Sequence, residues 1–343
     1  MTFRAFFSKN WRQAMNTSSC LRRLAASLCA VAAAGHLAYA QMPSASQASL
    51  IVPYPAGSAF DIAARQIQTE LGKNLGKTVI VENIGGASGS IGAQRLLSAD
   101  PNHLTMMIGS PNELALPPLM LSGVRYQPQD FRMVAHVTTG VLAILARPDY
   151  PATDLPELIA RAQAPGAKPI SIANVGLGSI FHVAAADLSQ RAAVPVTHVP
   201  YKGGAPIMQD LMGKQVDMTV LPLIPSSIQA AKEGRIRVLA VLGPNRHAAM
   251  PDVPSVDEVA SLKGMHYTMW TGIFTASKLP IAVAEKINKA ANPVVASASF
   301  RKWSEEQGNL AGEVIDLNQA AEFYGRESEK FRKLATEIRL ERQ

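Results

Sequence analysis

The sequence predicts an α/β protein with mostly parallel sheets. From Leu50 onward, apolar stretches typical of buried strands alternate with amphipathic segments typical of helices. Several of the strand-like stretches end in short loops that contain glycine. This alternation is typical of parallel strands joined by crossover helices. The stretch 41–343 is long enough for two domains, each with its own hydrophobic core.

Residues 1–40 have the pattern of a secretory signal peptide. They contain five of the 33 Lys and Arg residues of the chain and no acidic residue. The apolar run Leu24–Ala34 follows the basic part, and Ala-Tyr-Ala at 38–40 supplies the small-residue end that signal peptidases prefer. We therefore expect export and cleavage after Ala40.

Without residues 1–40, the composition excludes several classes of protein. Cys20 and Cys29 both lie in this segment, so the rest of the chain has no disulfide, thiolate metal site or cysteine nucleophile. The formal net charge falls from +7 to +2, because five basic residues are lost with the segment. The main argument for nucleic-acid binding disappears with that charge. The later sequence has no apolar run long enough for a transmembrane helix.

The stretch Leu50–Leu71 predicts a strand, a loop with proline and glycine, and a helix. Leu50–Val52 are apolar, and the apolar residues of the helix recur at helical spacing. Ser58 and Asp61 form the S-x-x-D pattern of a capped helix start, and Gly72 predicts the end. Such a helix start retains free N–H groups and a partial positive charge that suit a carboxylate or phosphate. By themselves, these residues also fit a plain surface cap.

Strand-like and helix-like segments continue to the end of the chain. The predicted strands are Thr78–Glu82, Leu104–Ile108, Ile170–Ala173, Val196–Tyr201, Val216–Val220 and Ile236–Val241, with Met133–Ala146 as a long apolar stretch that could cross between domains. The predicted helices include segments ending at Leu97, covering Leu155–Ala162, starting at Ser179 and lying around Ile207–Met212. The last third is predicted to be helical over Ile281–Ala291, Val294–Gln307 after a break at Pro293, and Asn318–Leu340.

Two further strand ends are followed by glycine-containing loops and helix starts. In Asn174–His182, Ser179 occupies a predicted N-cap position, and His182 in the first turn could donate to an anion. Pro200–Pro206 forms the third loop of this kind, with Pro206 suited to a first helical position. Ligands of open α/β sheets bind at the carboxyl ends of strands. Three such loops, divided between two halves of the chain, predict a cleft for a small anion, although a single glycine loop is more often a plain turn.

Other types of site find little support in the sequence. Gly86, Gly89 and Gly92 miss the dinucleotide pattern G-x-G-x-x-G at its second glycine. The chain has no G-x-S-x-G or H-E-x-x-H motif, and the histidines after residue 40 show no metal-binding pair at helical spacing. A set of Ser179, His182 and an aspartate stays open as a hydrolytic alternative. We predict no metal, no cofactor and no catalytic residue.

Several motifs, in order along the chain, resemble those of the Bug receptors, which are the extracytoplasmic substrate-binding proteins of tripartite tricarboxylate transporters. The motifs are YPAGSAFD at 54–61, VEN at 81–83, GASGSIGA at 86–93, GS at 109–110, GLGS at 176–179 with His182, VPYKG at 199–203, PDVPSV at 251–256, and Trp270 with Gly272. The resemblance covers nearly all of the chain after residue 40.

The resemblance implies a periplasmic binding protein fold, type II-like, with a ligand cleft between two lobes. Each lobe would have a mostly parallel sheet flanked by helices. The expected first lobe comprises 41–142 and 266–343, and the expected second lobe comprises 143–265. The implied function is capture of a small mono-, di- or tricarboxylate in the periplasm by a monomer, for delivery to the membrane subunits of a tripartite tricarboxylate-type transporter. A receptor for a sensor kinase and a hydrolytic enzyme using the same cleft are the alternatives.

The resemblance also implies the ligand site. In the family, the loop matching Tyr54–Asp61 holds one ligand carboxylate, largely through backbone N–H groups and water. Loops matching Asn174–His182 and Tyr201–Gly203 contribute from the opposite lobe. The expected ligand-binding residues are Tyr54, Ala56, Gly57, Ser58, Ala59, Asp61, Ser110, Asn174, Gly178, Ser179, His182, Tyr201, Lys202 and Gly203.

This chain departs from the family pattern at three places. Gly57-Ser58 stands where the family usually has two glycines. Gly109-Ser110-Pro111 replaces Gly-Ser-Asn, which removes an amide side chain near the expected cleft. Leu221-Pro222 stands where an aspartate often follows the strand, and this favours a plain carboxylate ligand over an amino acid.

Overall fold

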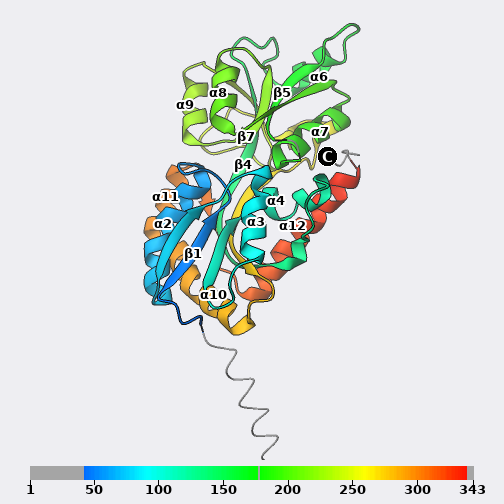
Figure 1. Cartoon of the computed structure of the whole chain (residues 1–343). Coiled ribbons are helices and arrows are strands. Elements are labelled where there is room, and N and C mark those ends of the chain that lie inside the picture. Colours follow the sequence, from blue (N-terminus) through cyan, green and yellow to red (C-terminus); the bar gives the residue numbers. More distant parts are fainter. Residues whose placement is uncertain (1–41, 177, 338–343) are drawn as a thin grey trace, which may run out of the picture.

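The computed structural model describes residues 42–176 and 178–337 (Figure 1). The predicted signal peptide and its cleavage site lie outside the described residues. The chain forms two lobes, and the long strand β4 (Phe131–Ala146) runs from one into the other. The predicted α/β class is confirmed, and the long apolar stretch does cross between the two sheets.

The first lobe is built on a sheet with the strand order β2-β1-β3-β9-β4, and β10 pairs with β4. The outer strands β1, β2 and β3 are parallel, whereas β9 runs antiparallel between β3 and β4. The strand bounds are β1 Gln47–Val52, β2 Thr78–Asn83, β3 Leu104–Gly109, β9 Thr268–Ala276 and β10 Asn309–Ala311.

Helices cover this sheet through their apolar faces. Ile67 and Leu71 of α2 pack with Ile287 of α10 and with the apolar residues of β1 and β3 in one buried cluster. The helix bounds in this lobe are α2 Ala59–Leu75, α3 Ser90–Leu97, α4 Pro111–Leu114, α5 Pro117–Met120, α10 Ile281–Ala296 and α11 Ala298–Glu306.

In the second lobe, the last part of β4 lies between β7 and β8, antiparallel to both. β5 continues the sheet parallel to β7, and β6 continues it parallel to β5. The strand bounds are β5 Ile170–Val175, β6 Val196–Tyr201, β7 Met218–Pro222 and β8 Arg237–Val241, and the helix bounds are α6 Leu155–Ala162, α7 Ile180–Ala192, α8 Gly204–Met212 and α9 Pro225–Lys232.

The last described helix, α12 (Leu317–Glu337), packs against both lobes (Figure 1). Tyr324 belongs to a buried cluster with Trp270 of β9 in the first lobe. Phe331 and Leu334, about two turns further along, belong to the large cluster that forms the core of the second lobe. Among residues 42–176 and 178–337, no helix has the length and apolarity needed to cross a bilayer.

The predicted end of α2 at Gly72 is wrong. The helix continues to Leu75, and Gly76 ends it with a left-handed backbone (φ 65°). A Cβ on Gly72 would lie 2.7 Å from the backbone oxygen of Lys77. Gly72 therefore serves close backbone packing rather than helix termination.

The predicted break at Pro293 is also wrong, because α10 runs on to Ala296. Pro293 lies inside α10, where it removes one intrahelical N–H donor without ending the helix. The change of direction comes at Ser297, whose extended backbone ends α10 and whose hydroxyl accepts from Phe300 N–H to start α11. Strand β9 was not predicted, since Thr268–Ala276 mixes Thr and Gly with apolar residues.

Candidate functional site

The loops predicted to bind the ligand lie at the carboxyl ends of parallel strands in both lobes, and contacts between the lobes bring them together. A Cβ on Gly176, after β5, would lie 3.2 Å from the hydroxyl of Ser88, after β2. The backbone N–H of Ile180 in α7 donates to Oδ1 of Asn112 in α4 at 2.8 Å. The segments that follow β2 and β3 in the first lobe therefore contact the loop and the helix start that follow β5 in the second lobe.

The start of α2 has the predicted cap. The backbone of Ser58 is extended (φ −69°, ψ 160°), and its hydroxyl accepts from Asp61 N–H at 3.3 Å. The carboxylate of Asp61 accepts from Gly57 N–H at 2.9 Å, one residue earlier than in a standard capping box, while Ser58 N–H donates to Pro55 O. The side chain of Asp61 thus closes the loop in front of the helix.

The carboxylate of Asp61 is held from three sides. Arg65 pairs with both of its oxygens at 3.0 Å, and the amide of Asn83 donates to Oδ1 at 3.0 Å. The hydrogen bond from Arg65, together with those from Gly57 and Asn83, lowers the pKa of Asp61 to about 2 despite its burial. The structure gives Asp61 the role of holding the loop in shape.

Two backbone donors at the start of α2 remain free. In the described part of the chain, the N–H groups of Ala59 and Phe60 have no hydrogen-bond acceptor. They lie at the positive end of a 17-residue helix. The ring of Tyr54 packs against Phe60 with centroids 4.7 Å apart, and Ala56 is exposed in the loop. This helix start can accept an anion.

A buried glutamate that the sequence analysis missed lies next to this loop. The hydroxyls of Tyr54 and Ser110 both donate to Oε2 of Glu113, at 3.1 and 2.9 Å. Burial raises the pKa of Glu113 to about 8. Ser110 caps α4 and Glu113 stands three residues later, so the S-x-x-E spacing was a usable signal. The family pattern has an asparagine where this chain has Pro111. Asn112, one position later, supplies an amide side chain that the sequence analysis did not single out.

In the second lobe, Ser179 caps α7 as predicted, since its hydroxyl accepts from His182 N–H at 3.3 Å. Nδ1 of His182 accepts from Gly178 N–H at 3.0 Å, and the ring lies edge-on to His198 at 4.4 Å. Burial, and then the charge of His198, lower the pKa of His182 to about 4. His182 is therefore neutral near pH 7, and only its Nε2–H remains to donate to a ligand.

The other predicted residues of the second lobe are placed as follows. Asn174 is buried, and its amide donates to His198 Nδ1 at 3.2 Å. The hydroxyl of Tyr201 donates to Asp210 at 2.5 Å, and this bond raises the pKa of Tyr201 to about 12. Lys202 is exposed, and Gly203 directly precedes α8. Because β6 is parallel to β5, this loop lies at the same sheet edge as Asn174.

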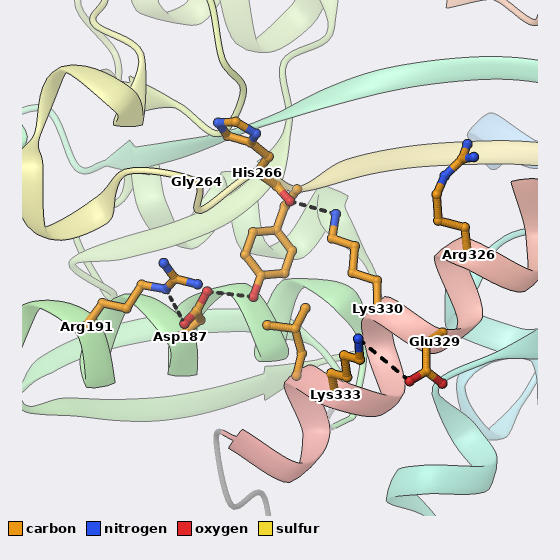
Figure 2. Close-up of a pocket in the computed structure, with 10 residues that line it drawn as sticks. Asp187, Arg191, Gly264, His266, Arg326, Glu329, Lys330 and Lys333 are labelled. Atoms are coloured by element: carbon orange, nitrogen blue, oxygen red, sulfur yellow. Dashed lines mark hydrogen bonds and ion pairs between the residues drawn. The ribbon is translucent and has the colours of Figure 1, made fainter.

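A pocket of about 420 Å³ lies elsewhere, between α7 and α12 (Figure 2). It is lined by Asp187, Arg191, Gly264, His266, Tyr267, Arg326, Glu329, Lys330, Lys333 and Leu334, none of which belongs to the predicted ligand site. Asp187 bonds Arg191 at 2.7 Å and Tyr267 at 2.9 Å, and Lys330 donates to the His266 carbonyl at 2.9 Å. These side chains already use their hydrogen-bonding groups on one another. The pocket therefore marks the packing contact between α12 and the second lobe rather than a ligand site.

The donor set of the facing loops suits an anion better than a metal ion. Backbone N–H groups, hydroxyls and amides predominate there, whereas hard cations require several carboxylate or carbonyl oxygens. In 42–176 and 178–337, no three His, Cys, Asp or Glu side chains are grouped so that they could hold a metal ion.

Comparison with solved structures places this architecture among periplasmic binding proteins. The periplasmic binding protein BugD is 28% identical, with a TM-score of 0.75 over 87% of this chain and 99% of that one. MatC from Rhodopseudomonas palustris, solved with bound malate, is 26% identical, with a TM-score of 0.74, and the match covers 84% of this chain and 98% of MatC. Rpa4515 from R. palustris, solved with adipate, is 25% identical, with a TM-score of 0.77, and the match covers 87% of this chain and 98% of Rpa4515.

The family model described as "Tripartite tricarboxylate transporter family receptor" matches residues 63–340. This span includes most of both lobes, and the likeness to the periplasmic binding protein BugD covers 87% of this chain. The chain therefore belongs to the tripartite tricarboxylate transporter receptor family, the Bug receptors, a family of periplasmic solute-binding proteins.

Proposed function

We propose that this protein captures a small mono-, di- or tricarboxylate between its lobes and releases it unchanged to the membrane subunits of a tripartite tricarboxylate-type transporter. The lobes that close would be 41–142 with 266–343 and 143–265. The family and the bound malate and adipate of two structural neighbours support this class of ligand. The protein would act in the periplasm after removal of residues 1–40.

The observation that carries the proposal is the start of α2. Ala59 and Phe60 present two adjacent N–H groups without acceptors in the described chain, at the positive end of a long helix. The hydroxyls of Tyr54 and Ser110 come from neighbouring loops, but both already donate to Glu113. Two charge-assisted hydrogen bonds of about 1.5–3 kcal/mol each supply about 3–6 kcal/mol. Micromolar binding, about −8 kcal/mol net of the cost of ordering the ligand, therefore requires one or two further bonds of this kind from the second lobe.

Binding without chemical conversion is the simplest use of this geometry. Ser179 has a histidine in the same helix turn, but its hydroxyl donates to the Gly176 carbonyl at 2.9 Å. The hydroxyl also accepts from His182 N–H, and Nδ1 of His182 is engaged by Gly178. A nucleophile needs a free base within hydrogen-bond distance, and these contacts favour a capping role instead.

A thermal-shift screen over acetate, malate, adipate, citrate and glutamate tests the proposal. A ligand present at one hundred times its Kd adds about 2.7 kcal/mol to the free energy of unfolding. We expect at least one carboxylate to raise the Tm, and mass spectrometry of the recovered ligand to show the same acid after overnight incubation. Absence of a shift with every acid, or turnover of the bound acid, would contradict the proposal.

A pair of glycine variants tests the location of the site. Gly57 and Gly76 both have positive φ (80° and 65°), and in the described chain a Cβ on either would meet no atom within 4 Å. They lie at opposite ends of α2. Gly57→Val and Gly76→Val should therefore strain the backbone to a similar degree. We expect only Gly57→Val to abolish the ligand-induced shift, and an unchanged shift in that variant would move the site away from this loop.

A further inference from the structure

Glu113 combines three features that the fold alone does not require. Glu113 is fully buried, and this burial is the largest cause of the raised pKa of its carboxyl. Its Oε2 receives the hydroxyls of Tyr54 and Ser110, which come from two different ligand loops. Its Oε1 has no hydrogen-bond partner in the described chain. A buried carboxyl with an unpartnered oxygen costs free energy, so a structural role alone explains it poorly.

The protonation state of Glu113 determines what the two hydroxyls can offer a ligand. When the carboxyl is ionised, both hydroxyls donate to it and can only accept from a ligand. When a proton sits on Oε2, the carboxyl donates to one of the hydroxyl oxygens, and the hydrogen of that hydroxyl becomes free. A carboxylate ligand accepts hydrogen bonds and repels a second negative charge, so it favours the protonated carboxyl on both counts.

We propose that Glu113 is a positioning residue that turns the hydroxyls of Tyr54 and Ser110 toward a carboxylate ligand, and that the receptor takes up one proton from solvent at this carboxyl when the ligand binds. The inference rests on the proposed function and adds to it a coupling between ligand and proton. Ligands that carry a donor toward this point, such as an ammonium group, would favour the ionised carboxyl instead and release the proton.

The side chains that face Glu113 do not titrate between pH 7 and pH 9, so Glu113 is the group that changes its protonation in this range. Tyr54 contacts it from the β1–α2 loop, Tyr126 donates to its backbone oxygen, and Tyr324 faces it from α12. Burial raises the pKa of all three tyrosines. Asn112 and Ser110, beside it on the same turn, do not titrate.

The coupling predicts a characteristic pH dependence of affinity. Burial holds the pKa of Glu113 near 8 in the free protein. Above that pH the carboxyl must gain its proton for the ligand to bind, so the Kd should rise by up to about tenfold per pH unit. Malate and adipate are already fully ionised in this range, and their own titration therefore adds nothing.

Isothermal titration calorimetry tests the proposal with acetate, malate and adipate as probes, at pH 7 and pH 9, in buffers of high and low ionisation enthalpy. We expect uptake of about one proton per bound acid at pH 9 and clearly less at pH 7. Binding with no proton uptake at pH 9 would overturn the inference while leaving the proposed function intact. If none of the three acids binds, citrate and glutamate are titrated as well, and no binding of any of the five acids would overturn both.

Variants separate positioning from general destabilisation. Glu113→Gln keeps the shape of the protonated acid and cannot titrate, so its Kd should be flat between pH 7 and pH 9 and its proton uptake close to zero. Glu327→Gln removes a carboxylate of α12 that accepts from Trp270 at 3.1 Å and should retain the wild-type uptake. The double variant Tyr54→Phe with Ser110→Ala keeps Glu113 but removes both hydroxyls. An unchanged pH dependence in either Glu113→Gln or the double variant would overturn the proposal.

Discussion

Oδ1 of Asn112 accepts a hydrogen bond from the backbone N–H of Ile180 at 2.8 Å, and this bond joins the two lobes. Asn112 belongs to α4 of the first lobe, and Ile180 is the first residue of α7 in the second. The bond uses a first-turn donor of α7 that would otherwise be available to an anion. The first lobe therefore supplies an internal partner for the second-lobe helix, and α2 becomes the better anion site.

Asn112→Ala should shift the ligand-free protein toward more open arrangements of the lobes. Loss of one neutral hydrogen bond costs about 1 kcal/mol, which corresponds to about a fivefold change in the ratio of closed to open molecules. Small-angle X-ray scattering should show a larger radius of gyration without ligand. Asn74→Ala is the control, because Asn74 donates to the Ala290 carbonyl at 2.9 Å within the first lobe. Equal radii of gyration for the ligand-free wild type and Asn112→Ala would show that this hydrogen bond does not hold the lobes together.

Asp61→Ala should destabilise the protein at neutral pH by about 1–3 kcal/mol, because Gly57 and Asn83 lose their acceptor and Arg65 its partner. The native pKa of Asp61 is lowered from 3.8 to about 2. Its contribution is therefore complete above about pH 4 and is lost as the pH falls through 2. Urea unfolding at pH 7, 4 and 2.5 should show the difference from wild type shrinking with acid.

The control for Asp61 lies on the same helix. Glu70 is exposed and pairs with the equally exposed Lys73, so Glu70→Gln should change the free energy of unfolding by less than about 0.5 kcal/mol. A gap between Asp61→Ala and wild type that stayed constant down to pH 2.5 would show that the carboxylate charge is not the source of the stabilisation.

His182→Asn should flatten the dependence of stability on pH between 6.5 and 4. The native pKa of His182 is lowered to about 4, so in this range the unfolded chain binds the proton and the folded chain does not. Wild-type stability therefore falls as the pH drops through this window. Asparagine retains an acceptor for Gly178 N–H and cannot titrate. Denaturant unfolding at half-unit pH steps measures the effect, and parallel curves for the two proteins would refute it.

Lys202→Gln should slow association of a dicarboxylate. Lys202 is exposed at the edge where the second-lobe loops gather, so its charge acts mainly by attracting the anion from a distance. We expect the association rate constant to fall about two- to fivefold at low salt and to match wild type at about 0.5 M salt, where screening removes the effect. Stopped-flow tryptophan fluorescence measures the association rate constant at both salt concentrations. A loss that persists at high salt would instead indicate direct contact with the ligand.

The amino-acid sequence by itself determined the features that depend on neighbouring residues. The alternation of strands and helices, the caps at Ser58 and Ser179, and the crossing strand all follow from periodicity and short motifs, and the structure confirms them. The ordered motifs likewise identified the family. Such features are encoded locally, because capping and hydrophobic periodicity act over a few residues.

Only the tertiary structure decided which groups are free and which are already used. Gly72 resembles a helix stop in sequence, yet the backbone oxygen of Lys77 explains it. Glu113 was not singled out from its sequence, but folding buries it beneath the hydroxyls of two loops. Asn112 reaches Ile180 across 68 positions in the chain. Burial and hydrogen bonding between distant segments set the charge and the availability of each polar group, and these contacts exist only once the lobes have packed.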